Sequence, residues 1–246
     1  MKFKVLFFIF TIINVLTATG QKSLEIIYKV PKVDFSYQKQ NKKKISAYTQ
    51  LVERKTNEYA QPMDFILKVN PNESYYYMAD FLPPENWESN MVIMAKYLGA
   101  GFYKYYQSKS GNKILRQFKE RGKWFIGVDS LNGDRNHWRI TQITDTILGH
   151  KVIKAVNKDR PKLVVWFAPD LPVPFGPMGY GNLPGLILKK EIENMPTTVL
   201  VAQKIIYYNK PFKIQPFTKG KIESEADIRA RNLRGAIEMQ KRFGKH

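Results

Sequence analysis

Two histidines and a few aspartates are the side chains whose types could support acid–base or metal chemistry in this chain. The 246 residues include three histidines, of which His137 and His150 lie in the interior of the sequence. Asp129 and Asp134 precede His137, and carboxylates beside an imidazole suit a metal site or a histidine base. Asn132-Gly133 between them is typical of a turn with solvated polar groups. We predict no metal ligand and no catalytic residue, with a secreted hydrolase or metal-dependent enzyme using His137 or His150 as the alternative.

Recognisable catalytic motifs are absent from the sequence. It contains no G-x-S-x-G, no H-E-x-x-H, no P-loop and no G-x-G-x-x-G. It also contains no cysteine, which excludes thiol catalysis, disulfides and a lipoprotein anchor. We therefore expect a protein that is not an enzyme and needs no cofactor.

Residues 172–185, with the sequence PVPFGPMGYGNLPG, are the most unusual segment and are called the Pro/Gly loop below. Proline fixes φ and glycine permits positive φ, so their alternation predicts one rigid backbone path. Burying each large apolar side chain is worth about 1.5–3 kcal/mol, so this segment must be covered. It either closes the core as a lid or forms the mouth of an apolar cavity or docking patch. The candidate ligand- or partner-binding residues are Phe175, Met178, Tyr180, Asn182, Leu183, Pro184 and Gly185.

The segment Asn182-Leu183-Pro184-Gly185-Leu186-Ile187 resembles the defining motif of the GLPGLI family, a set of secreted proteins from Bacteroidetes. The resemblance extends over residues 138–194 and includes Trp138-Arg139-Ile140 and Trp166-Phe167-Ala168-Pro169-Asp170. Asn182 stands where the family has glycine, and Val152 stands where it often has cysteine. The resemblance implies export, and it implies no activity because the family has no established function.

The N-terminus independently predicts export. Lys2 and Lys4 precede an apolar run that ends at the small residues Ala18-Thr19-Gly20, as in a secretory signal peptide. We predict a signal peptide over 1–20, cleaved after Gly20, and a single β-rich domain over 21–246. The expected location is the periplasm or the cell surface, with no transmembrane span after cleavage.

The charge balance indicates which partners the protein attracts. The chain has 40 Lys and Arg against 21 Asp and Glu, a net charge of +19. A field of this sign attracts polyanions. For an exported protein these are anionic lipid, lipopolysaccharide or an outer-membrane protein, and nucleic acid is not expected.

Most of the chain predicts short antiparallel strands. Aromatic and β-branched residues cluster between turn residues such as Asn70-Pro71-Asn72 and Leu148-Gly149-His150, which favour hairpins. A meander of this length curls by its own twist into a curved sheet, a half-barrel, a barrel or a packed pair of sheets. Tyr75-Tyr76-Tyr77 and residues 102–106 are explained by the alternation of core and solvent faces, rather than by stacking on a ligand. The predicted strands are Leu24–Val33, Ile45–Arg54, Phe65–Val69, Ser74–Met78, Phe102–Gln107, Ile114–Phe118, Trp124–Val128, Trp138–Thr144, Lys151–Val156, Lys162–Phe167, Leu186–Glu193 and Val199–Tyr207.

Two helices are expected beside the strands, one short and internal over Glu88–Leu98 and one over 224–243 that begins at the capping pair Ser224 and Asp227. Since Lys162–Phe167 is apolar on both faces, we expect these helices to cover its second face. The C-terminal helix carries candidate contact residues for an anionic partner: Arg229, Arg231, Arg234, Lys241 and Arg242. This helix also supports a further alternative, a structural accessory of an envelope transport or secretion assembly.

Two short patterns indicate modification. Asp129-Ser130-Leu131 and Asp145-Thr146-Ile147 match the Asp-Ser/Thr-apolar pattern for O-glycosylation of exported Bacteroidetes proteins, with Ser130 and Thr146 as the acceptors. The functional hypothesis is thus an exported, non-enzymatic envelope protein that binds an apolar or amphiphilic ligand or an outer-membrane partner through residues 172–185.

Overall fold

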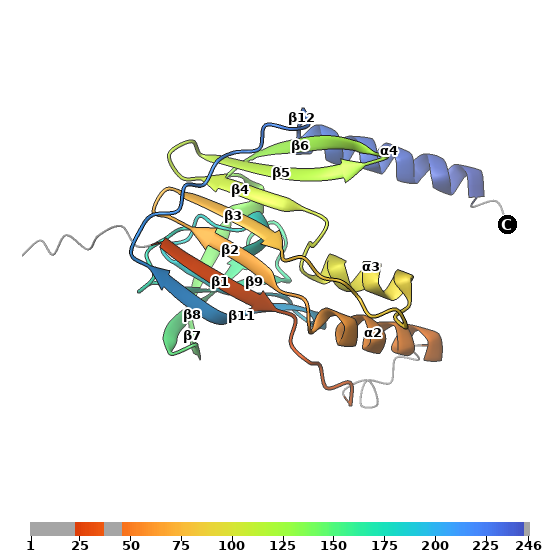
Figure 1. The fold of residues 1–246 in the computed structure, drawn as a ribbon, viewed down its shortest axis with the longest axis horizontal. Helices are drawn as coiled ribbons and strands as arrows, with labels where there is room; N and C mark the ends of the chain where they lie inside the picture. The colour runs from red at the N-terminus through yellow and green to blue at the C-terminus, as the bar shows by residue number, and fades with distance from the viewer. Residues whose placement is uncertain (1–22, 37–45, 244–246) are drawn as a thin grey trace, which may run out of the picture.

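The protein forms one sheet of twelve strands in a computed structural model that describes residues 23–36 and 46–243, with side chains to residue 234 (Figure 1). The predicted signal peptide lies outside the described residues. The strands are β1 (Ser23–Lys29), β2 (Phe65–Val69), β3 (Glu73–Met78), β4 (Lys104–Ser108), β5 (Lys113–Glu120), β6 (Lys123–Ser130), β7 (Trp138–Ile147), β8 (His150–Asn157), β9 (Leu163–Ala168), β10 (Leu186–Ile192), β11 (Met195–Tyr208) and β12 (Lys221–Ser224).

Two antiparallel meanders make up the sheet, whose order is β12-β6-β5-β4-β3-β2-β1-β11-β10-β9-β8-β7. Strands β1 to β6 form the first arm and β7 to β11 the second, and the pairing of β1 with β11 joins them. The short edge strand β12 pairs parallel to β6. The sheet curves so that β7, β8 and β9 lie behind the first arm, and it stays open because β12 and β7 are its two edges (Figure 1). The predicted curved, mainly β fold is confirmed.

The hairpin turns follow the chemistry expected of them. Leu148 and Gly149 have φ of 52° and 80°, as a two-residue turn between β7 and β8 requires. Asn70 stabilises the β2–β3 turn, because its side-chain oxygen accepts from the backbone N–H groups of Asn72 and Glu73 at 2.9 and 2.7 Å. These local signals were sufficient to predict that the flanking strands form hairpins.

Three α-helices occur in the described part of the chain: α2 (Ala47–Ala60), α3 (Ser89–Leu98) and α4 (Glu225–Phe243). The strand predicted over Ile45–Arg54 is wrong, because residues 47–54 of this segment belong to α2. Ser46 caps α2 by accepting from the N–H of Thr49 at 3.1 Å, and residues 50–55 are mostly strong helix formers. The alternation of Tyr48 and Val52 with polar residues resembled a strand. The Ser46 cap and the helix propensities of residues 50–55 nevertheless favour the helix.

The other two helices were expected. Helix α3 packs against α2 and buries Met91, Val92 and Ala95 in the main core. Helix α4 begins where predicted, since the Ser224 hydroxyl accepts from the N–H of Asp227 at 3.0 Å. All three helices lie at the same end of the sheet (Figure 1). None of the helices within the described ranges is both long and apolar enough to cross a membrane.

Strand β9 is buried along its whole length, as its apolar sequence predicts. One face joins the main core through Val164, Trp166 and Ala168. The other face packs on Tyr180 and Leu183 of the Pro/Gly loop, and among the described side chains no α-helix contributes to this second cluster. The expectation that helices cover this face is therefore wrong. The loop replaces them because it carries large apolar side chains and begins directly after β9.

Candidate ligand-binding cleft

The Pro/Gly loop crosses the inside of the curved sheet from the second arm to the first. It leaves β9, and its short 3-10 turn at Pro177–Gly179 contacts β3, β4 and β5 of the first arm. The carbonyl of Tyr180 accepts from Gln107 Nε2 on β4 at 3.1 Å. The carbonyl of Gly181 accepts from Trp138 Nε1 on β7 at 2.8 Å. The loop therefore ties the two arms together.

The connection between β6 and β7 supplies the remaining polar partners of the loop. The Asn136 side chain accepts from the N–H of Gly181 at 2.9 Å and donates to the carbonyl of Gly179 at 3.4 Å. Arg135 donates to the carbonyl of Met178 at 3.4 Å, and its Nε lies 3.5 Å from Asp129 Oδ2. Satisfied backbone groups are what a buried loop needs, since an unpaired one costs about 1–3 kcal/mol.

Gly179 and Gly185 show why this path requires glycine. Gly179 has φ of 76° and lies against the Tyr105 ring, where a Cβ would be 2.8 Å from a ring carbon. A Cβ on Gly185 would lie 2.2 Å from the backbone oxygen of Ala168. The predicted rigidity of the loop thus has a steric cause, namely close backbone packing in its interior.

The apolar candidates in the loop face the core. Phe175 is 0% exposed, Leu183 3% and Tyr180 6%, and Gly185 is also buried. Met178 is half-buried, and only Asn182 and Pro184 are exposed. These apolar side chains form no exposed patch in this structure. Of the two interpretations of the loop, their placement supports the structural one, in which the loop fills the core.

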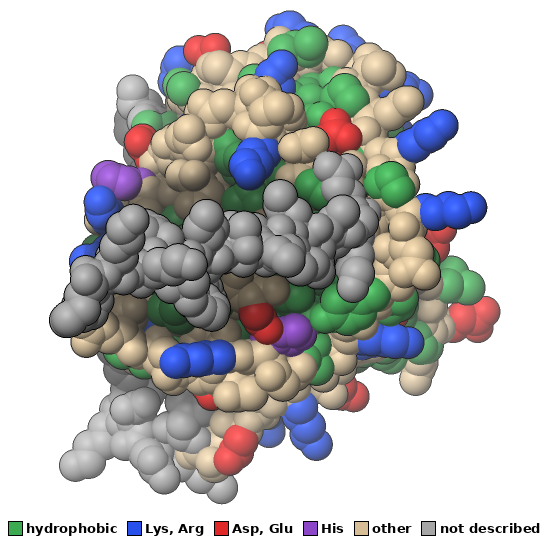
Figure 2. Space-filling view, turned by 90° about the vertical axis from the view of Figure 1, so that its left-hand side faces the viewer, with side chains coloured by type: hydrophobic (Ala, Val, Ile, Leu, Met, Phe, Trp, Pro, Cys, Tyr) green, Lys and Arg blue, Asp and Glu red, His purple; other side chains and the backbone are tan. Residues whose placement is uncertain are grey.

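The histidines do not meet in one site. His137 lies beside the end of β8 and His150 at its start, so the length of the strand separates them. Figure 2 shows two histidines well apart on the surface. His137 Nδ1 lies 3.2 Å from Asp159, and both side chains are about half exposed. His150 Nδ1 lies 2.6 Å from Asp170, and its Nε2 lies 3.4 Å from the Tyr207 hydroxyl. Across the described residues, no three His, Cys, Asp or Glu side chains are grouped to hold a metal ion.

Helix α4 is fixed to the sheet by a buried ion pair. Arg116 on β5 donates to both carboxylate oxygens of Glu225, at 2.6 and 3.0 Å. The same guanidinium lies 4.8 Å from the ring centroids of Tyr103 and Phe118. Opposite Arg116, Gly127 leaves the space that the Glu225 carboxylate occupies. The ion pair thereby holds the first turn of α4 over these two rings, which are called the aromatic floor below.

A cleft of about 290 Å³ lies between this floor, the end of α3 and α4, and is called the helical cleft below. Its volume is close to the lower limit of ligand pockets, about 300 Å³. Arg116 is held by Glu225, and Glu120 is held by Arg231, so Lys119 is the lining cation without an ion-pair partner among the described side chains. The lining residues are Tyr97, Phe102, Tyr103, Arg116, Phe118, Lys119, Glu120, Ile228 and Asn232.

Sequence reasoning missed this cleft because its residues come from four separate elements. Phe102 and Tyr103 were attributed to strand alternation, and β4 begins only at Lys104. The signal was present in part, since aromatic residues next to lysines preceded the strand and an amphipathic helix followed much later. Nothing in the sequence indicates that α3 and α4 face each other.

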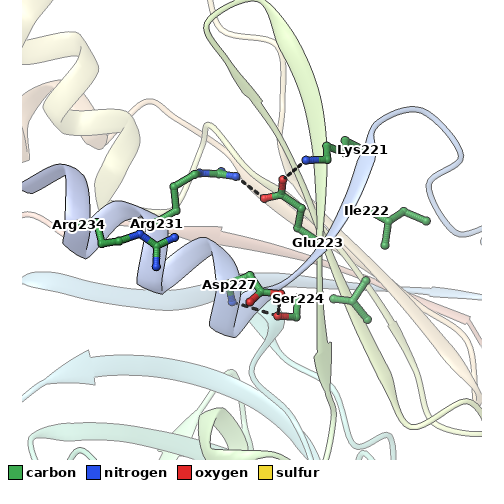
Figure 3. Close-up of a pocket in the computed structure, with 8 residues that line it drawn as sticks. Lys221, Ile222, Glu223, Ser224, Asp227, Arg231 and Arg234 are labelled. Atoms are coloured by element: carbon green, nitrogen blue, oxygen red, sulfur yellow. Dashed lines mark hydrogen bonds and ion pairs between the residues drawn. The ribbon is translucent and has the colours of Figure 1, made fainter.

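The other flank of α4 carries a larger groove of about 770 Å³ (Figure 3). Its carboxylates are already engaged, because Glu223 pairs with both Lys221 and Arg231, while Asp227 accepts from the Ser224 hydroxyl. Arg234 makes no marked interaction with this network in Figure 3 and has no ion-pair partner in the described chain. Of the predicted contact arginines, Arg231 is therefore held in ion pairs, while Arg234 has no ion-pair partner among the described residues.

The remaining candidates are placed as follows. Arg229 is largely exposed, and its guanidinium lies 3.8 Å from Asp129. Lys241 and Arg242 belong to α4, but their side chains lie outside the described part. Thr146 is exposed on the edge strand β7, and Ser130 is half-buried at the end of β6. Exposure leaves Thr146 the more accessible acceptor for O-glycosylation, which stays a prediction.

Burial changes the acidity of a tyrosine between the loop and the cleft. Tyr105 lies under Gly179, and desolvation raises its pKa to about 12, opposed by the nearby Arg135 and Arg116. The hydroxyl is thus neutral at physiological pH and adds no negative charge beside Arg116.

Comparisons with known proteins give little beyond this geometry. No protein-family model matches the chain, and no curated protein matches it. A solved structure described as PNGF-II in the P21 space group is similar, with 16% identity and a TM-score of 0.49. The match covers 85% of this chain and 32% of that one, so this chain spans about a third of its length. At this level the likeness assigns neither a family nor an activity.

Proposed function

We propose that the protein is an exported, non-enzymatic binding protein of the cell envelope, and that it binds an anionic amphiphile in the helical cleft. The expectation of export rests on the N-terminal sequence. The absence of catalytic motifs in the sequence and the separation of the two histidines favour binding over hydrolysis. The burial of the apolar Pro/Gly loop side chains favours the cleft over the loop as the contact surface.

The observation that carries this proposal is the pairing of aromatic walls with one unpaired cation. Tyr97 and Phe102 pack at 4.8 Å between ring centroids while staying 55% and 41% exposed, an arrangement that leaves apolar surface for a ligand. Lys119 is exposed and lies at the same cleft. An alkyl chain would contact the rings and an anionic headgroup would pair with the lysine.

Titration with dodecyl phosphate below its micellar concentration tests the proposal, with dodecanol as the uncharged probe of the same chain length. We expect the phosphate to bind more tightly than the alcohol. Phe102→Ser should weaken dodecyl phosphate binding about tenfold, since it removes roughly 1–1.5 kcal/mol of apolar contact. Lys119→Gln should remove the preference for the charged probe.

Ile143→Ser provides the matched control, because Ile143 is 54% exposed on the far edge strand β7. It should leave the dissociation constant unchanged. Equal affinity of wild type and Phe102→Ser for dodecyl phosphate would reject the helical cleft as the binding site.

A further inference from the structure

Several exposed cations lie at the end of the molecule that carries the helical cleft. Arg121 and Lys123 lie at the β5–β6 turn, directly after Lys119 and Glu120 of the cleft lining. Both are exposed, and neither has an ion-pair partner among the described residues. Lys104 at the start of β4 and Arg234 on α4 are also exposed without such a partner.

The acidic residues beside these cations do not neutralise them. Glu120 and Glu223 are both held by Arg231, whose guanidinium also lies 5.1 Å from the Phe125 ring centroid. The basic side chains around the mouth are therefore available to an external anion. Figure 1 shows the β5–β6 turn, α3 and α4 at one end of the molecule.

Apolar side chains project at the same end. Tyr97, Phe102 and Leu233 are exposed by 55%, 41% and 63%. Aromatic and aliphatic side chains beside lysine and arginine are the combination that inserts into the headgroup region of an anionic bilayer. At the opposite end, the basic side chains visible in Figure 2 are scattered singly over the face.

We propose that this end of the molecule, with the β5–β6 turn and the tip of α3 around the cleft mouth, docks on an anionic lipid bilayer. The inference rests on the proposed function in one respect, because it identifies the bilayer as the source of the amphiphile. The charge complementarity selects the occupant: four exposed cations without acidic partners, Lys104, Arg121, Lys123 and Arg234, face the headgroups. Docking places the cleft mouth at the depth of the lipid phosphates.

Co-sedimentation of residues 21–246 with lipid vesicles tests this directly. We expect binding to vesicles of equimolar phosphatidylglycerol and phosphatidylcholine, and at least tenfold weaker binding to pure phosphatidylcholine. The variant Arg121→Asn with Lys123→Gln should lower partitioning about 30-fold, because each basic residue near an anionic surface contributes about 1 kcal/mol. Asparagine suits position 121, where φ is 47°.

The matched control removes the same charge at the other end of the same strands. Lys109→Gln with Lys113→Gln changes the exposed β4–β5 turn and should reduce partitioning less than threefold. Equal losses in the two variants would overturn the proposal, since they would reveal attraction by net charge alone. Binding of wild type to polyglutamate but not to the anionic vesicles would also overturn it and would indicate an acidic protein partner.

Failure of docking and failure of the cleft can be told apart. Neither Arg121 nor Lys123 lines the helical cleft, so their variant should still bind soluble dodecyl phosphate. If the wild-type protein binds dodecyl phosphate but does not bind the anionic vesicles, docking is rejected and the proposed function still stands.

Discussion

At the residue scale, Lys190 is the most unusual ionisable group in the core. Its side chain is 5% exposed, and its Nζ donates to the carbonyl of Thr198 at 3.2 Å. Burial lowers its pKa from 10.5 to about 8, with a smaller contribution from the charge of Arg160. The folded protein therefore releases this proton at a lower pH than the unfolded chain.

This shift predicts a rise in stability with pH. Between pH 8 and 10.5 the unfolded chain holds more protons at this site than the folded protein, so the free energy of unfolding increases with pH. We expect a gain of roughly 1 kcal/mol between pH 7 and pH 9, measured by urea unfolding. Lys190→Met should abolish the gain and be more stable than wild type at pH 7. A flat profile in the wild-type protein would show that the lysine is solvated.

Single residues were predicted from the sequence where their role is local. The Ser224 cap, the left-handed Gly149 and the buried β9 side chains all follow from neighbours within a few positions. The positions of Arg116 and Lys119 in the helical cleft do not. Arg116 and its partner Glu225 are separated by 109 positions, and no local pattern indicates that they meet.

At the element scale, the Pro/Gly loop acts as an internal strut of the curved sheet. Its sequence predicted rigidity and the need for cover, and both agree with its buried apolar side chains. What the sequence did not indicate is the direction of the loop, which runs into the curve instead of over an end. That direction depends on Gln107, Trp138 and Asn136, which are distant in sequence and come together only in the folded sheet.

Gly185→Ala tests the strut. The new Cβ would meet the backbone oxygen of Ala168 at 2.2 Å, and a backbone atom cannot move aside as a flexible side chain can. We expect the free energy of unfolding to fall by about 2–3 kcal/mol in a urea titration. Gly111→Ala, in the exposed β4–β5 turn, should change it by less than about 0.5 kcal/mol. Equal effects of the two substitutions would mean that the loop packs loosely.

Helix α2 shows the limit of strand prediction by alternation. A short segment with Tyr48, Leu51 and Val52 fits both a strand and a helix, and its cap at Ser46 decides between them. Once α2 forms, it packs on α3, whose residue Tyr97 lines the helical cleft. An element that was assigned wrongly thus contributes to the site that was missed.

At the scale of the whole molecule, two meanders joined at β1 and β11 curve around the Pro/Gly loop, and the helices gather at one end. The curvature and the antiparallel order could be predicted because they follow from strand twist and hairpin turns. The clustering of α3, α4 and the β5–β6 turn could not, because it results from the register of twelve strands. This clustering is what concentrates aromatic rings and unpaired cations around one cleft.

The central claim is that ligand binds between α3 and α4, while the Pro/Gly loop is structural. Hydrogen exchange measured by mass spectrometry, with and without dodecyl phosphate, tests it most directly. The account predicts ligand-dependent protection in residues 97–103, 116–120 and 228–234, and no change in residues 172–185. Protection confined to residues 172–185 would contradict it and would return the binding site to the loop.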